Sequence, residues 1–342
     1  MRAVVLEKTG GPEQLVLREV ADPQPRPDEA IVRVRAAGVC GRDLIDRRGG
    51  FPMMKLPTIL GHEFAGEVVA VGRDVTSLAP GARVTNLHRP WCGHCASCEA
   101  GETVDCEVAW QTFGLSVDGA YAELVAAHHR ALVELPAGVS FEAAAPLGCT
   151  AGVALRALRG AAQLRFGESV LVTGASGGVG MPALAIARLL GARQVVATTT
   201  SASKVDALKA AGADHVVVST DGRFDAEVRK LSDGGVDVAL ELTGAPGFPG
   251  ALRSLRRRGR LVIAGNITPE KLAFNAGAVI LFSYRILGSH GASHRDLVEC
   301  IDLLAKGSLS MHIDRALPLA QAADAHRLLA DRGVVGRVVL QP

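Results

Sequence analysis

The sequence predicts an α/β protein of two domains, one a doubly wound parallel sheet and the other built from short strands. The chain has 342 residues, which is too long for one ordinary core and suits two. From residue 150 to residue 287, apolar β-branched runs alternate with amphipathic helical stretches, whereas the residues before them read as strands and turns. A glycine-rich turn joins the first of these apolar runs to a helix.

That turn has the composition of a nucleotide-binding loop. It follows the apolar run 170–172 and precedes a stretch of helical period at 181–190. Gly177 would let the backbone approach a diphosphate, Gly180 would let the helix pack closely on its strand, and the first N–H groups of the helix would face the anion. A tight turn without a ligand is the alternative, but the strand and helix on either side favour dinucleotide binding. The predicted turn residues are Ser176, Gly177, Gly178, Val179 and Gly180.

The alternation around the turn predicts a parallel sheet with right-handed crossovers. Amphipathic helices are expected at 203–211 and 224–231. The predicted strands are residues 169–173, 194–199, 215–218, 236–240 and 260–264.

The segments on either side of this region are expected to form the second domain. Strand-like runs lie at 30–34, 66–71 and 120–125, separated by glycine, proline and aspartate. The tail contains two predicted helices, 294–305 and 320–329, and a closing strand, 336–340. We expect the tail to return to the first domain and leave a cleft between the two. The predicted division is therefore 1–149 with 288–342 for the β-rich domain, and 150–287 for the parallel sheet.

The composition bears on partners and location. Apolar residues make up 48% of the chain, charged residues 21%, and the net charge is +2, so neither a nucleic acid nor a membrane surface is an expected partner. No apolar run approaches the roughly 20 residues that cross a bilayer. The N-terminal residues read as a strand and carry no signal-peptide pattern, which makes the cytoplasm the expected location.

Four of the seven cysteines form a compact cluster, Cys92-x2-Cys95-x2-Cys98-x7-Cys106. Four thiolates this close in sequence can complete a tetrahedral shell, which suits a structural zinc ion because no position stays open for chemistry. An iron–sulfur cluster is possible with the same ligands, and a redox pair or four unrelated thiols is the simpler explanation. We favour zinc.

A second set of metal-ligand residue types is dispersed along the chain. Cys40 lies in Gly-Val-Cys-Gly-Arg-Asp, His62 and Glu63 lie in Gly-His-Glu-Phe-Ala-Gly-Glu, and Cys149 lies in Pro-Leu-Gly-Cys-Thr. Taken singly, each has an ordinary explanation, because buried cysteines and histidines are common in cores.

Together these motifs resemble the zinc-containing medium-chain dehydrogenase/reductase family, of the alcohol dehydrogenase type. The resemblance rests on Gly-His-Glu, the four-cysteine spacing, the Gly-Gly-Val-Gly turn and the Gly-Arg-x-Val sequence near the C-terminus, and it covers essentially the whole chain. It implies a GroES-like catalytic domain beside a Rossmann domain, two zinc ions per chain, a small-molecule substrate, and a homodimer or homotetramer. A dimer would form through the edge of the Rossmann sheet.

The resemblance also assigns site residues. Cys40, His62 and Cys149 would be the catalytic zinc ligands, and Glu63 would be a carboxylate that exchanges with water or substrate. Asp43 would orient His62, as metal-bound imidazoles require. Arg337 would contact the cofactor diphosphate, and the remaining expected cofactor residues are Thr243 and Gly265.

The residues after the second predicted Rossmann strand favour NADP(H) over NAD(H). An NAD-specific enzyme places an acidic residue there to bind the ribose 2′-hydroxyl. This chain has Thr199 at that position, followed by Ser201 and Lys204, although these hydroxyls could simply cap the next helix. We interpret the basic run 256–260 as the end of a helix, with Gly259 as its stop, rather than as a phosphate site.

One departure from the alcohol dehydrogenase pattern affects the substrate. The usual proton relay has a hydroxyl two positions after the first zinc cysteine, but this chain has Arg42 there and Ile45 further along. Arginine stays protonated and cannot shuttle a proton, although Asp46 or water could replace it. Residues 40–44 and 265–269 look similar to acryloyl-CoA reductases of the family.

Three functions are therefore considered, of which the first is the one that the sequence favours and the second is its alternative. The first is a zinc- and NADP(H)-dependent oxidoreductase acting on an alcohol and its aldehyde or ketone. The second is an NADPH-dependent reductase of an activated C=C bond in an enoyl thioester. The third is a dinucleotide-binding protein without catalysis, which the complete set of zinc ligands argues against.

Overall fold

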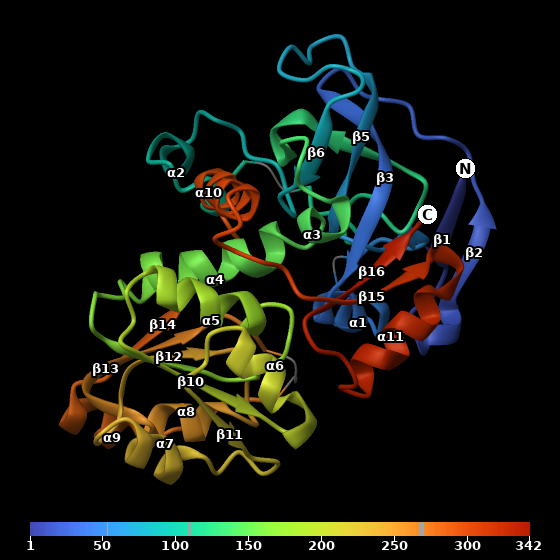
Figure 1. Cartoon of the computed structure of the whole chain (residues 1–342). Helices are drawn as coiled ribbons and strands as arrows, with labels where there is room; N and C mark the ends of the chain where they lie inside the picture. Colours follow the sequence, from blue (N-terminus) through green and yellow to red (C-terminus); the bar gives the residue numbers. More distant parts are fainter. Residues whose placement is uncertain (53, 109–110, 267–269) are drawn as a thin grey trace. The chain divides into compact units, whose positions relative to one another are not determined.

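The computed structural model describes residues 1–52, 54–108, 111–266 and 270–342. The chain divides into two compact units, one of residues 1–152 and 291–342 and the other of residues 153–290. The boundaries fall after Gly152 and His290, a few residues beyond the positions expected from the sequence. In the described part of the chain, no sheet is shared between the units: the strands of the first unit form two sheets and those of the second form one (Figure 1).

The second unit is the predicted doubly wound sheet. Its six strands are all parallel and run in the order β11-β10-β9-β12-β13-β14. Because β10 and β12 pair with opposite edges of β9, the strand order reverses there, which is where open α/β sheets bind their ligands. The strands are β9 (Ser169–Val172), β10 (Gln194–Thr199), β11 (His215–Val218), β12 (Val236–Glu241), β13 (Leu255–Ile263) and β14 (Arg285–Gly288).

Helices connect these strands, as the alternating pattern predicts. The crossover from β9 to β10 is α5 (Gly180–Leu189), whose apolar residues are almost all buried. The other helices of this unit are α4 (Val153–Leu155), α6 (Val205–Ala210), α7 (Asp225–Leu231), α8 (Phe248–Arg253) and α9 (Ala276–Phe282).

The basic run 256–260 is not the end of a helix, and our interpretation of it is wrong. Helix α8 ends at Arg253, and the run lies inside β13. Leu255 and Leu261 are buried on either side of the run, and Arg256 lies 3.3 Å from Asp237 of the neighbouring strand. Leu255 and Arg260, at the two ends of this stretch, pair with β12, and Arg260 also pairs with β14, so long-range pairing overrides a local composition that resembles a helix stop.

The first unit contains a seven-stranded sheet and a three-stranded sheet. The larger sheet runs β15-β16-β3-β5-β6-β8, with β7 also paired to β3, and the smaller runs β2-β1-β4. Pairing of β16 with β3, Leu340 against Ala37, shows how the tail returns to the first domain. The strands are β1 (Arg2–Leu6), β2 (Leu15–Glu19), β3 (Glu29–Val39), β4 (Thr58–Ile59), β5 (Glu63–Val71), β6 (Arg83–Asn86), β7 (Leu124–His128), β8 (Leu132–Glu134), β15 (Ile313–Pro318) and β16 (Arg337–Gln341).

The predicted strand at 120–125 is displaced toward the C-terminus. Strand β7 begins at Leu124. Ala120 and Tyr121 lie in a loop, where their backbone N–H groups donate to the carbonyls of Gly61 and Leu60. The helices of this unit are α1 (Gly41–Arg47), α2 (Ala96–Glu99), α3 (Phe141–Ala144), α10 (His294–Ala305) and α11 (Ala322–Ala330).

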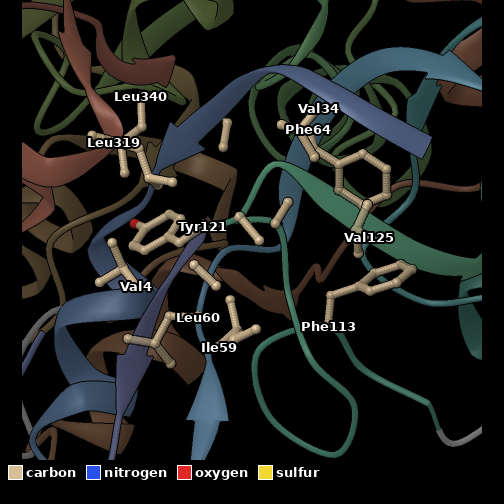
Figure 2. Close-up of a cluster of buried hydrophobic side chains, with 14 of the residues drawn as sticks. Val4, Val34, Ile59, Leu60, Phe64, Phe113, Tyr121, Val125, Leu319 and Leu340 are labelled. Carbon is tan, nitrogen blue, oxygen red and sulfur yellow. The ribbon is translucent and has the colours of Figure 1, made fainter. Parts of the chain in front are cut away.

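An apolar core fills the space between the strands of this unit and α11. Figure 2 shows ten labelled members of it, including Phe64, Phe113 and Tyr121. Phe64 and Phe113 pack edge to face with their ring centroids 5.3 Å apart. Within the residues described, no helix is long and apolar enough to cross a bilayer.

Candidate metal and nucleotide sites

The first metal-site cysteine is fixed where a strand becomes a helix. Cys40 follows the last residue of β3 and is the N-cap of α1. Its backbone N–H donates to the Asp43 carboxylate at 2.9 Å, so one short helix turn holds both side chains.

His62 and Glu63 are presented by a second turn that requires glycine. Gly61 has φ = +96°, and a side chain there would place its Cβ 2.5 Å from the Tyr121 ring. The chain can therefore turn tightly into β5 with His62 and Glu63 both buried at its start. Cys149 comes from a π-helical turn, Gly148–Gly152, much later in the sequence.

The structure brings these four predicted residues together. The ligand atoms of Cys40, His62, Glu63 and Cys149 all lie within 4.8 Å of one another. His62 Nε2 is 3.5 Å from Cys149 Sγ, and His62 Nδ1 is 2.9 Å from Asp43 Oδ1. Because Nδ1 donates its hydrogen bond to Asp43, Nε2 is the ring nitrogen that faces the two sulfur atoms and that can bind a metal once its proton is displaced.

This donor set fits a zinc ion on chemical grounds. Two thiolates and one imidazole are the ligands that catalytic zinc sites use when they leave a fourth position open. Glu63 supplies a further oxygen: its Oε2 is buried and has no hydrogen-bond partner among the described residues, while Oε1 accepts from Arg337 Nη2 at 2.8 Å. A buried carboxylate oxygen without a partner is costly, and a cation would relieve that cost.

The electrostatics of the site depend on the same contacts. Burial raises the pKa of the Asp43 carboxyl, but the neighbouring His62 outweighs burial and the net shift is downward. Burial and Arg42 lower the pKa of His62, whereas Asp43 and Cys40 raise it further, to about 10. Metal binding must therefore displace a proton from this imidazole. Burial raises the pKa of Glu63 to about 8, although Arg337 acts in the opposite direction.

The four clustered cysteines also converge. Cys92, Cys95, Cys98 and Cys106 place their sulfur atoms within 4.8 Å of one another, and Cys92 Sγ lies 3.9 Å from Cys98 Sγ. A tetrahedral zinc with Zn–S bonds of about 2.3 Å would separate its sulfur atoms by about 3.8 Å. Backbone N–H groups of Cys92 and Cys95 also point at sulfur atoms of the cluster, at 3.2 and 3.3 Å, as expected around thiolates.

The predicted nucleotide turn lies at the carboxyl end of the first Rossmann strand. Ser176, Gly177, Gly178 and Val179 occupy the loop between β9 and α5, and Gly180 begins the helix. A Cβ at Gly180 would lie 2.5 Å from the backbone of Ala175, so only glycine permits this approach of helix and loop. At Gly177 the nearest atom would be 3.4 Å away, and the position is open.

The other predicted cofactor residues lie at the ends of neighbouring strands. Thr199 ends β10, and its Oγ1 accepts from the N–H of Ser201 at 3.3 Å. Lys204 is buried in the turn before α6. Thr243 follows β12, and a Cβ at Gly265 would lie 2.5 Å from the Leu242 carbonyl, so the ends of β12 and β13 approach closely.

The sequence did not reveal the residue that organises this end of the sheet. Glu241 is fully buried and accepts hydrogen bonds from the hydroxyls of Thr173 and Thr243 and from the backbone N–H of Gly244. Its position as the last residue of β12 was the only available signal.

Arg337 and Arg42 have defined partners within the first unit. Arg337 pairs with Glu63 and also donates to the Val39 carbonyl at 3.4 Å, so the structure links it to the metal-site carboxylate. Arg42 Nη2 donates to the Phe113 carbonyl at 2.7 Å, and its Nε lies 3.2 Å from Asp46. In the stretch 265–269, Ile267, Thr268 and Pro269 lie outside the described residues.

Comparison with known proteins assigns both units. Residues 26–137 match the alcohol dehydrogenase GroES-like domain, and residues 178–306 match the zinc-binding dehydrogenase domain. The chain is 37% identical to an acryloyl-coenzyme A reductase of Metallosphaera sedula, with 99% of each chain covered. It is 34% identical to an alcohol dehydrogenase of Geobacillus stearothermophilus, and the aligned region covers 100% of this chain and 99% of that relative.

A solved structure extends this similarity to three dimensions. The crystal structure of AibC superposes with a TM-score of 0.93 at 42% identity, covering 100% of this chain and 96% of AibC. The fold expected from the sequence, a GroES-like domain and a Rossmann domain, is confirmed by these matches. The chain belongs to the zinc-containing medium-chain dehydrogenase/reductase family of NAD(P)-dependent oxidoreductases.

Proposed function

We propose that this enzyme uses NADPH to reduce an activated C=C bond conjugated to a thioester carbonyl. The observation that carries this choice is Arg42, which replaces the hydroxyl that would relay an alcohol proton. Its guanidinium is engaged by the Phe113 carbonyl and by Asp46, so no proton-accepting atom stands at that position. The similarity to acryloyl-coenzyme A reductases over the full chain supports the same choice.

In this proposal Cys40, His62 and Cys149 hold a zinc ion, and Glu63 is the carboxylate that exchanges with an outer ligand. When bound, the metal supplies a Lewis acid that polarises a carbonyl oxygen. Asp43 accepts from Nδ1–H and so leaves Nε2 as the nitrogen that would bind the metal after losing its proton. Hydride from the nicotinamide goes to the β-carbon of the enoyl group, and the α-carbon takes a proton.

We further propose a second, structural zinc ion on Cys92, Cys95, Cys98 and Cys106, which makes two per chain. Among the described residues no two cysteines form a disulfide, and a site of four thiolates needs a reducing compartment. That requirement supports the cytoplasm as the site of action.

We place the cofactor at the carboxyl ends of the Rossmann strands. Residues 176–180 would hold the cofactor diphosphate at the start of α5. The positive charge of Arg337 would contact the same diphosphate. Thr199, Ser201 and Lys204 would bind the 2′-phosphate of NADPH, because residues 198–204 contain no carboxylate to repel it. Thr243 and Gly265 would line the path toward the nicotinamide.

Oxidation of alcohols or reduction of aldehydes and ketones is the second candidate. The observation that favours it is Asp46, a fully buried carboxylate that is ion-paired with Arg42 but whose oxygens have no hydrogen-bond partner among the described residues. Burial raises the pKa of Asp46 to about 7, which suits a group that passes protons at neutral pH. Asp46 could thus replace the missing hydroxyl relay.

Acryloyl-CoA and propanal, which share a three-carbon skeleton, distinguish the two candidates. NADPH consumption is followed with each substrate, and the products are identified by mass spectrometry. We expect kcat/KM to be higher for acryloyl-CoA, with the saturated thioester as product. A higher kcat/KM for propanal would overturn the first candidate in favour of the second. The same assay with NADH tests the cofactor preference.

We also propose that the chain forms a homodimer, or a homotetramer built from such dimers. Strand β14 is an edge of the six-stranded sheet and has one partner strand there. The preceding helix α9 exposes 79% of Ile280 and 62% of Leu281, which a second copy could cover. Sedimentation velocity of the wild type and of Ile280→Asp tests this: a wild-type monomer would contradict it.

A further inference from the structure

We propose that Tyr121 and His326 position the metal-binding imidazole of His62 by acting through Asp43. This inference rests on the proposed role of Cys40, His62 and Cys149 as metal ligands. It adds two positioning residues, one of them on helix α11, to a set of metal-ligand candidates that lies within residues 40–149.

A continuous chain of contacts joins these side chains. The Tyr121 hydroxyl donates to Asp43 Oδ2 at 3.1 Å and lies 3.3 Å from His326 Nε2. On its other oxygen, Asp43 lies 2.9 Å from His62 Nδ1. His326 thus reaches the metal-site imidazole through two intervening side chains.

All four side chains in this series of contacts are closed to solvent. Asp43, Tyr121 and His326 are 0% exposed, and His62 is 1% exposed. Figure 2 shows the Tyr121 ring among apolar side chains, with its hydroxyl oxygen pointing away from Phe64 and Phe113. In such surroundings water cannot replace a lost partner, so each hydrogen bond is more important than it would be at the surface.

The proton positions follow from what each atom can do. Asp43 can only accept, so the single hydroxyl proton of Tyr121 points at Asp43, and the tyrosine oxygen is left to accept from His326 Nε2–H. His326 Nδ1 has no hydrogen-bond partner among the described residues. This arrangement needs His326 as the Nε2–H tautomer, because the other tautomer would draw the tyrosine proton away from Asp43.

Asp43 is consequently held from three sides. It accepts from the Tyr121 hydroxyl, from the backbone N–H of Cys40 at 2.9 Å and from the imidazole of His62. With its carboxylate fixed, Asp43 fixes the plane of the His62 ring and aims Nε2 toward Cys149. Groups that orient a metal-bound imidazole typically contribute 10- to 100-fold to metal affinity.

The chain offers a matched pair of variants, because it contains two tyrosines. Tyr121→Phe removes only the hydroxyl that contacts Asp43. Tyr284→Phe removes a hydroxyl that donates to the Leu255 carbonyl, also at 3.1 Å, in the Rossmann unit. Both substitutions delete one hydrogen bond of the same length, and only the first is in the proposed network.

The experiment measures zinc release from the full-length protein to a chromophoric chelator. Cys149→Ala serves to identify the release phase of the proposed catalytic zinc, because that phase should be absent from this variant. We expect Tyr121→Phe to release that zinc about tenfold faster than the wild type, with Tyr284→Phe unchanged and the release from the four-cysteine cluster unaffected. Equal rates in Tyr121→Phe and Tyr284→Phe would overturn the proposal and leave the metal site itself standing.

His326 is tested by rescue. His326→Gln keeps an amide N–H that can donate to Tyr121, whereas His326→Leu cannot donate. We expect His326→Leu to release the Cys149-dependent zinc faster and His326→Gln to stay near the wild type. Loss of both metals together from Tyr121→Phe would indicate unfolding. In that case the comparison of His326→Leu with His326→Gln tests the proposal. Equal release from the two His326 variants would then overturn the proposal. A wild type without Cys149-dependent zinc would overturn both this inference and the proposed metal site.

Discussion

Arg42 combines three contacts that a serine at the same position could not make. It donates to the Phe113 carbonyl, pairs with Asp46 and lies close enough to His62 to lower the pKa of that imidazole. Removing it therefore leaves the buried Asp46 carboxylate without its cation, which is costly when a buried pair loses one member. For this reason Arg42→Ser is best studied together with Asp46→Asn.

The double variant Arg42→Ser/Asp46→Asn restores a hydroxyl at the relay position without a stranded charge. We expect it to raise alcohol oxidation more than carbonyl or enoyl reduction, because a well-placed general acid–base group is worth about 10²–10⁴ in rate. Rates in both directions are measured at saturating cofactor. Arg35→Ser, which removes an exposed arginine paired with Glu67, is the control. An unchanged ratio of oxidation rate to reduction rate would contradict the idea that Arg42 disables a proton relay for alcohols.

The end of β10 gives a second prediction for a single residue. Thr199→Asp places a carboxylate where an NAD-specific enzyme would have one, so it should repel the 2′-phosphate and bind the ribose 2′-hydroxyl instead. We expect weaker NADPH binding and stronger NADH binding, measured by fluorescence titration of each cofactor. If the wild type binds NADH more tightly than NADPH, the cofactor assignment is wrong.

At the scale of elements, the four-cysteine segment has little else to stabilise it. Residues 92–106 contain one short α-helix, α2, and one 3-10 turn, Thr103–Asp105, and their buried apolar side chains are Val104 and the cysteines Cys98 and Cys106. A metal ion bound there would contribute directly to folding, as it does in small zinc domains. The segment should therefore unfold locally when its metal is lost, while the sheets stay intact.

Cys98→Ala tests this expectation. We predict that the variant contains one zinc ion fewer than the wild type by elemental analysis. We also predict that its amide hydrogens at 92–106 exchange faster, with the Rossmann strands unchanged. Cys300→Ala is the matched control, because Cys300 is fully buried on α10 and belongs to neither cluster of metal-ligand residues. Full zinc content in Cys98→Ala would rule out the structural role.

The elements also show what the sequence could reveal. Five of the six Rossmann strands were predicted, because each contains an apolar run and is followed by a helix, and β10 and β11 have the predicted bounds. Strand β14 was not predicted, and β13 begins at Leu255 instead of residue 260. The interpretation of 256–260 failed because the local composition of this run is that of a helix end, whereas the strand is set by pairing of Leu255 and Arg260 with β12 and of Arg260 with β14. Tyr121 and His326 were beyond sequence reasoning: 205 positions separate them, and neither belongs to a motif.

For the whole molecule, the two units carry separate parts of the proposed chemistry. All the metal-ligand candidates belong to residues 1–152, and every proposed cofactor residue except Arg337 belongs to residues 153–290. Substitutions can therefore be made in the metal-ligand candidates or in the proposed cofactor residues of one unit without changing a residue of the other. Arg337 is the exception, since it pairs with Glu63 in the first unit and is also proposed to contact the diphosphate.

The stability of the first unit should depend on pH through His326. Burial is the main cause that lowers the pKa of His326, to about 4, with Arg47 and Arg48 acting in the same direction and Asp43 against them. The Tyr121 hydroxyl is its neutral neighbour. Because the folded-state pKa lies below the value of about 6.5 for an unfolded histidine, the unfolded chain takes up the proton first. Stability is therefore complete above pH 6.5 and is lost as the pH falls toward 4.

His326→Gln has no side chain that titrates at this position. Comparing it with the wild type therefore separates the contribution of His326 from those of the other groups that titrate in acid. We expect the wild type to lose about 2 kcal/mol more unfolding free energy than His326→Gln between pH 7.5 and pH 5, from the linkage between the two pKa values. Denaturant unfolding followed by tryptophan fluorescence is the measurement, because both tryptophans, Trp91 and Trp110, belong to the sequence of the first unit. A difference between the two proteins that stays constant over this range would mean that His326 titrates alike in the folded and unfolded states, and burial would not then be what holds it neutral.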